Sequence, residues 1–114
     1  MKNKIVKIKT LLSLLFLFSL SFVHTQDKKK LTKTQIVEVS CGQCQFGMTE
    51  KKGCDLAVRI DGKCHFVDGT AIDSHGDAHK EDGFCNAIRK AAVTGEIKKN
   101  RFKVNAFRLL PEEK

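Results

Sequence analysis

Tyrosine and tryptophan are absent from this sequence, and proline occurs once, as Pro111. Without Tyr or Trp the chain lacks the rings on which nucleic-acid-binding proteins commonly stack bases, which argues against nucleic acid as a partner. A thioredoxin fold brings a cis-proline beside its Cys-x-x-Cys pair, and Pro111 lies at the wrong end of the chain for that role. No phosphate-binding glycine loop or other catalytic signature is present, so we expect no enzyme.

Long apolar runs are also scarce, and the single candidate lies at the N-terminus, from Leu11 to Val23. Four basic residues precede it, namely Lys2, Lys4, Lys7 and Lys9. The run is shorter than the roughly 20 residues that a membrane helix needs. We therefore predict a signal peptide over residues 1–25, with cleavage before Gln26 and with a retained anchor as the alternative. The expected protein is exported, periplasmic or secreted, and its mature form does not span a membrane.

The positive charge is concentrated at the ends of the chain. Removal of residues 1–25 takes away four of the 21 basic residues and none of the 13 acidic ones, which leaves 17 minus 13, or +4. From Thr34 to Leu110 there are 12 basic and 10 acidic residues. This near balance gives the folded part little reason to bind a polyanion.

Residues 26–114 suffice for one small domain, with a flexible basic tether at 26–33, the domain at 34–110 and a tail at 111–114. A core of this size gives marginal stability, so covalent or metal cross-links would help. All five cysteines lie in the exported part, where disulfides persist.

The hydrophobic pattern predicts a mainly β fold. Alternation predicts strands at 34–41, 54–60 and 63–67, with a hairpin turn at Asp61-Gly62 between the last two. A bulge at Gly42 would carry the first strand on to Met48. Residues 84–92 have helical spacing, and a second hairpin follows. The order strand, strand, strand, helix, strand, strand predicts a five-stranded OB-like barrel, with a ferredoxin-like or open sheet as the alternative.

Four cysteines, Cys41, Cys44, Cys54 and Cys85, are candidates for disulfides. In an extended strand the Cα atoms of Cys41 and Cys44 would lie about 10 Å apart, which is too far for a disulfide bond. A tight turn at Gly42 would allow that bond. The same four thiols form a chemically sufficient zinc set. A dithiol redox centre is a third interpretation, weakened by the glycines after Cys44. Cys64 would be a free, buried thiol.

The loop DSHGDAH offers a second metal-ligand set at alternate positions: Asp73, His75, Asp77 and His79. Two imidazoles and two carboxylates suit zinc, copper or nickel. The alternative is that these residues form turns before the helix, and we favour it.

Ordered motifs resemble a family of small exported bacterial proteins, a domain of unknown function. They are CGQCQFGM, GCDLAVRIDGK, FVDG, DSHGDAH, DGFCNAIRKAAVTGEI and RFKVNAFRLLP, and they cover Val37 to Pro111. The resemblance implies no activity, substrate or partner. It singles out the four candidate disulfide cysteines with His75, Asp77 and His79, whereas Cys64 departs from the pattern.

The sequence thus predicts a monomeric, exported binding or structural module with cysteine cross-links, no cofactor, and an unknown partner in the envelope or outside the cell. A zinc or copper protein and a thiol redox protein are the alternatives.

Overall fold

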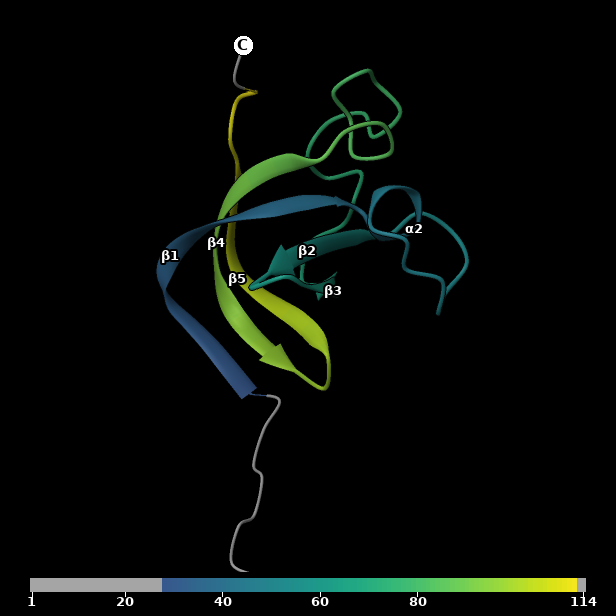
Figure 1. Ribbon diagram of the computed structural model, residues 1–114. Coiled ribbons are helices and arrows are strands. Elements are labelled where there is room, and N and C mark those ends of the chain that lie inside the picture. Colours follow the sequence, from purple (N-terminus) through teal and green to yellow (C-terminus); the bar gives the residue numbers. More distant parts are fainter. Residues whose placement is uncertain (1–27, 113–114) are drawn as a thin grey trace, which may run out of the picture.

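The computed structural model describes residues 28–112, which form five strands and one helical turn. The elements are β1 (Lys28–Cys41), α2 (Gly42–Gln45), β2 (Leu56–Ile60), β3 (Lys63–Asp68), β4 (Arg89–Lys98) and β5 (Arg101–Leu109). The strands close into a barrel in the order β1-β2-β3-β5-β4 (Figure 1). Neighbouring strands are antiparallel except β3 and β5, which run parallel. The prediction of a mainly β, five-stranded OB-like barrel with one short helix is confirmed, but the helix follows the first strand instead of the third. The predicted signal peptide lies outside the described residues.

Both predicted hairpins are present, and their turns have the backbone that such connections require. Asp61 and Gly62 join β2 to β3 with φ of 51° and 80°, and Lys99 and Asn100 join β4 to β5 with φ of 52° and 63°. Two consecutive residues with positive φ give the type I′ geometry that matches the twist of paired strands.

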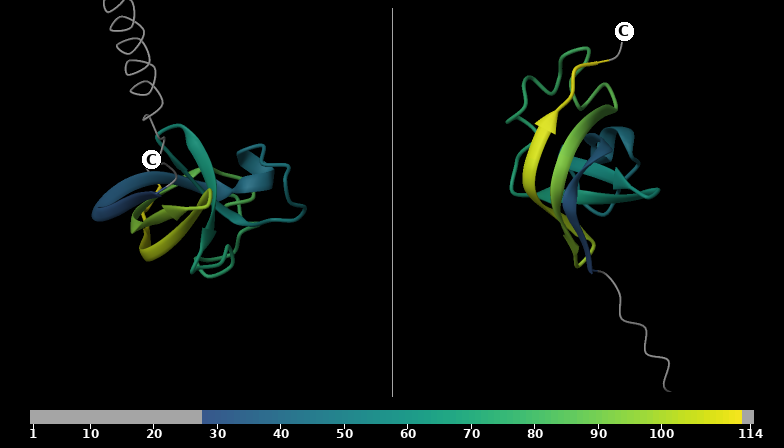
Figure 2. Two further views of the ribbon diagram at one scale, coloured as in Figure 1. Left: turned by 90° about the horizontal axis from the view of Figure 1, so that it is seen from below. Right: turned by 90° about the vertical axis from the view of Figure 1, so that its left-hand side faces the viewer.

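β1 begins earlier than expected and bends around the barrel, as Figure 2 shows. It begins at Lys28, so most of the segment 26–33 predicted as a flexible tether is a strand paired with β4. The pairing is interrupted by a register shift between Leu31 and Gln35. Beyond that irregularity β1 pairs with β4 on one side and with β2 on the other. The tether prediction was wrong because it used local polarity, whereas the strand is held by a distant partner.

The predicted bulge at Gly42 is also wrong. β1 ends at Cys41, and residues 42–45 form the helical turn α2, which Cys41 caps by accepting from the Cys44 N–H. The alternating apolar phase after Gly42 therefore does not continue the strand.

Residues 84–92, predicted as a helix, form a turn followed by the start of β4. One helical hydrogen bond forms, from the Ala87 N–H to the Gly83 carbonyl at 2.9 Å. Pairing between Arg89 and Val39 of β1 then takes over. Ala91 and Val93 are buried on one face of β4, so their apolar character serves a strand. Long-range pairing overrides the local helical spacing here.

The barrel interior is filled by alternate residues of all five strands. Buried members include Val39, Val58, Val93 and Phe102, each 0% exposed. A second cluster of Met48, Ala57 and Phe66 lies on the outer face of β2 and β3. In the described part of the chain, no helix is long and apolar enough to cross a membrane.

Candidate metal centre

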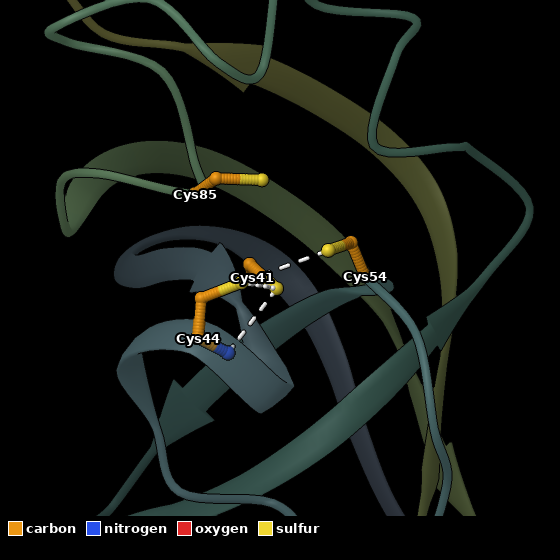
Figure 3. A group of neighbouring side chains, drawn as sticks. All are labelled: Cys41, Cys44, Cys54 and Cys85. Atoms are coloured by element: carbon orange, nitrogen blue, oxygen red, sulfur yellow. Dashed lines mark hydrogen bonds between the residues drawn. The ribbon is translucent and has the colours of Figure 1, made fainter.

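Four cysteine side chains gather at one end of the barrel, beside α2 (Figure 3). They are Cys41, Cys44, Cys54 and Cys85, called the cysteine cluster below. Their sulfur atoms all lie within 4.8 Å of one another. The Sγ atoms of Cys41 and Cys44 are 2.7 Å apart, and those of Cys44 and Cys54 are 3.7 Å apart. All five cysteines of the chain are free thiols in this structure.

The cluster is assembled from three segments that are distant in sequence. Cys41 ends β1 and Cys44 lies in α2. Cys54 lies just before β2, and Cys85 lies in the turn before β4. The tight turn at Gly42 that would bring the Cys-x-x-Cys sulfurs together is the alternative that the structure adopts. In a helical turn, residues three apart are neighbours on one face.

Backbone pairing aligns these segments with one another. The Cys41 N–H donates to the Phe84 carbonyl at 3.0 Å, next to Cys85, and the Gly42 N–H donates to the Asp55 carbonyl at 2.8 Å, next to Cys54. Each of the two distant segments is thus fixed to the end of β1 by a bond one residue from its cysteine.

The side chain of Gln43 joins α2 to the segment before β2. Its Nε2 donates to Asp55 Oδ2 at 2.7 Å, and its Oε1 accepts the Asp55 N–H at 2.9 Å. The hydrogen bond from Gln43 holds the pKa of the Asp55 carboxyl below its ordinary value. Both ends of the amide are used, so this pair also fixes the distance between Cys44 and Cys54.

Ser40 and Gln45 hold the turn that contains Cys85. The Ser40 hydroxyl, fully buried, lies 2.7 Å from the carbonyl oxygens of both Phe84 and Ala87. Gln45 Nε2 donates to the Cys85 carbonyl at 3.0 Å. The turn is therefore attached to β1 and to α2 by separate contacts.

Gly42 is required because α2 packs directly on the hydrophobic cluster of Met48, Ala57 and Phe66, called the outer cluster. A Cβ at this position would lie 2.7 Å from the Phe66 ring, 2.8 Å from Met48 Sδ and 3.1 Å from the Ala57 Cβ. These distances are below ordinary contact, so only glycine lets the turn pack this closely. The glycine of Cys-Gly-Gln-Cys thus sets the position of Cys44.

The electrostatics of the cysteine cluster do not favour a reactive thiolate. A hydrogen bond with the Cys41 thiol, with burial second, raises the pKa of the Cys44 thiol far above its ordinary value. Burial, followed by a hydrogen bond with Cys54, raises the pKa of the Cys85 thiol. The first cysteine of the pair, Cys41, is 0% exposed. A redox motif places an accessible cysteine first, so the burial of Cys41 argues against that role.

In number and kind, the four sulfur donors suit a tetrahedral metal ion. Four thiolates at Zn–S distances of about 2.3 Å would have sulfur–sulfur edges of about 3.8 Å. The Cys44–Cys54 separation of 3.7 Å matches that edge, and the Cys41–Cys44 separation of 2.7 Å is shorter. It is nonetheless longer than the roughly 2.05 Å of a disulfide bond.

The other predicted site residues lie elsewhere. Cys64 is half-buried on β3 against the outer cluster, where burial raises its pKa. It is outside the cysteine cluster.

The structure does not bring the Asp and His residues of the 73–79 loop together. His75 lies against the Phe107 ring at 4.2 Å between centroids, and its Nε2 is 2.8 Å from Thr70 Oγ1. The Nδ1 atom of His79 lies 4.0 Å from Oδ1 of Asp77. Among residues 28–112, the cysteine cluster is the one group of three or more such ligands close enough to share an ion. The turn-forming interpretation therefore describes this loop better.

Ser40, Gln43 and Gln45 had no place in the sequence predictions. Ser40 occupied a polar position of an alternating strand, which normally indicates exposure, and its burial comes from a turn 44 residues away. The two glutamines flank Cys44, and that adjacency was the one available signal.

Comparisons with known proteins give a family but no function. No curated protein and no solved structure matches the chain. A model of a family of unknown function matches residues 35–110, nearly the whole barrel. The chain belongs to the Family of unknown function (DUF6370).

Proposed function

We propose that this protein is an exported metal-binding module whose cysteine cluster binds one zinc ion. The supporting observation is that four sulfur atoms from three segments lie within 4.8 Å of one another. Four sulfur donors in a tetrahedral arrangement are typical of zinc, with copper as the alternative ion.

The proposed role of the ion is structural. Four protein ligands leave zinc no open position for substrate, which is the arrangement of structural and not catalytic sites. The ion would fasten α2 and the segments before β2 and β4 to the end of β1. The free energy of binding would then add directly to the stability of this end of the barrel.

Disulfide formation is the competing outcome, because an exported chain meets an oxidising environment. Cys41 and Cys44 have the shortest sulfur separation, 2.7 Å, which leaves Cys54 and Cys85 to each other. The two states differ in mass and in the number of thiols that react.

The deciding experiment is intact mass of the protein purified from an exporting cell, under native and denaturing conditions and without reductant. We expect one zinc per chain in the native sample and five thiols that react with an alkylating agent after denaturation with a chelator. One reactive thiol, a loss of four hydrogens and no metal would overturn the zinc proposal. The same spectrum tests export, since the processed chain should begin at Gln26.

Variants separate the cluster from the remaining cysteine. Cys44→Ser and Cys54→Ser should each weaken zinc binding by more than about 100-fold, since even loss of a residue that supports a ligand costs roughly 10- to 100-fold. Cys64→Ser should leave the affinity, measured by competition with a chelating dye, unchanged. Equal losses in all three variants would contradict the assignment of ligands.

A further inference from the structure

One end of the barrel carries five of the ten lysine and arginine side chains that form no ion pair among the described residues. Residues 28–31 of β1 pair with residues 95–98 of β4, which a hairpin turn joins to the start of β5, and Lys29 forms an ion pair with Asp61 in the turn between β2 and β3. We call this the basic end, formed by residues 28–31, 60–63 and 96–103. The start of β1 and the β4–β5 hairpin are at the bottom of Figure 1. The cysteine cluster, at the far end of β1, is distant from it.

Carboxylates neutralise only part of this charge. Lys29 pairs with Asp61, and Arg101 pairs with Asp68 at 2.7 Å. Five further lysines have no carboxylate within 4.0 Å among the described residues: Lys30, Lys63, Lys98, Lys99 and Lys103. Glu96 is the one carboxylate of the basic end outside these ion pairs.

The strand register places like charges opposite each other at this end. Lys98 is the register partner of Arg101 in β5. Like charges directly opposite across a sheet destabilise the pairing. An anion bound at this end would relieve the repulsion, so the observation points to an anionic partner independently of the charge count.

The opposite end has a different balance. Segments 42–55, 69–90 and 108–112 contain six basic and seven acidic residues. The near-neutral balance counted along the domain therefore hides a separation of charge along the barrel. The segment 26–33, predicted as a tether, contributes to this separation of charge, because Lys29 and Lys30 belong to β1.

We propose that the basic end docks onto an anionic phospholipid surface, with the cysteine cluster directed away from it. The chain enters the barrel here, and five residue steps separate Lys28 from Val23, the last residue of the apolar run. At about 3.3 Å per residue those steps span at most roughly 17 Å, so a retained segment would hold the basic end at the membrane. A processed chain would keep the lysines. The absence of Tyr and Trp disfavours a nucleic acid as the polyanion.

Vesicle partition tests this surface with the protein as purified from the exporting cell. Vesicles of phosphatidylcholine with one third phosphatidylglycerol are compared with pure phosphatidylcholine at low salt. The readout is the partition coefficient for anionic vesicles divided by that for neutral vesicles. A retained apolar segment would raise both coefficients alike and leave this ratio unchanged. Each lysine near an anionic surface strengthens partition by about fivefold, and salt screens the attraction.

The test variant replaces three lysines of the basic end: Lys63→Gln, Lys98→Gln and Lys99→Gln. The control removes the same charge elsewhere: Lys52→Gln, Lys80→Gln and Arg108→Gln. We expect the test variant to lose on the order of 100-fold in partition to anionic vesicles, and the control much less. Its melting temperature should not fall, since a like-charge contact is removed.

Three results would overturn the proposal. They are equal binding to both vesicle types, equal losses in the test and control variants, and tighter binding to a single-stranded oligonucleotide than to anionic vesicles at the same salt. The last would assign the basic end to nucleic acid.

Discussion

The replacement of Gly42 by alanine tests the packing that positions the cysteine cluster, because two opposing effects predict different signs. Alanine restricts the unfolded chain more than glycine does, which by itself stabilises a protein by about 0.4–1 kcal/mol. The new Cβ, however, would lie 2.7 Å from the Phe66 ring and 2.8 Å from Met48 Sδ. Overpacking of this kind costs typically 1–3 kcal/mol. The cost of overpacking should therefore exceed the gain from restricting the unfolded chain.

The expected result is a net loss of about 1–2 kcal/mol in the free energy of unfolding of Gly42→Ala. For a domain of this size that corresponds to a fall in melting temperature of roughly 4–16 °C. The assay is urea denaturation in reductant at a fixed free zinc concentration. Displacement of α2 would also move Cys44 away from Cys54, so zinc affinity should fall as well.

A second substitution identifies the cause. Met48→Ala removes one of the three atoms that the new Cβ would meet, so Gly42→Ala should cost less in that background than in the parent. Residues in contact show coupling energies of about 0.5–3 kcal/mol. A stabilised Gly42→Ala protein, or strictly additive effects of the two substitutions, would refute the steric explanation.

Two further predictions concern contacts away from α2. Ser40→Ala should cost about 1–3 kcal/mol, because the turn that contains Cys85 loses the Ser40 hydroxyl as a donor to the Phe84 or Ala87 carbonyl, and it should weaken zinc binding through Cys85. Denaturation and metal competition would show this, and Ser74→Ala, at an exposed site, is the control; equal effects of both would contradict the role. Arg101 hydrogen bonds hold the pKa of the Asp68 carboxyl below its ordinary 3.8, so this pair stabilises the fold above about pH 4 and loses that effect as the pH falls further. Both side chains are more than a third exposed, so Asp68→Asn should cost under about 1 kcal/mol at pH 6 and less at pH 2.5; a cost independent of pH would contradict it.

The barrel could be predicted from the sequence because its strands alternate and its hairpin turns have a local signature. Asp61-Gly62 is such a signal, and Val37 with Val39 shows the buried face of β1. Ala87 and Ala91 were misassigned because their spacing fits a helix as well as a turn followed by a strand. Only the pairing of β4 with β1 decides between them.

The members of the candidate site could be predicted, but their arrangement could not. The sequence indicated the four cysteines of the cluster as candidates, and it set Cys64 apart by its position within a strand and by its departure from the family motifs. Whether Gly42 formed a bulge or a turn depended on Phe66 and Asp55, which lie outside the motif and contact it only in the folded chain. The second metal-ligand set expected in the 73–79 loop did not form for a related reason. His75 lies against Phe107, and the alternation of residues within the loop cannot reveal that partner.

The position of the cysteines in the chain has a consequence for the order of assembly. All four members of the cluster precede β4, whereas the barrel cannot close until β5 has paired with β3 and β4. Contacts between residues distant in sequence form slowly, and the entropy cost of closing a loop grows with its length. With an ion bound, Cys41 and Cys85 would already be joined before β4 meets β1. The cysteine cluster would then form first and reduce the number of conformations through which the last two strands must pass to complete the barrel.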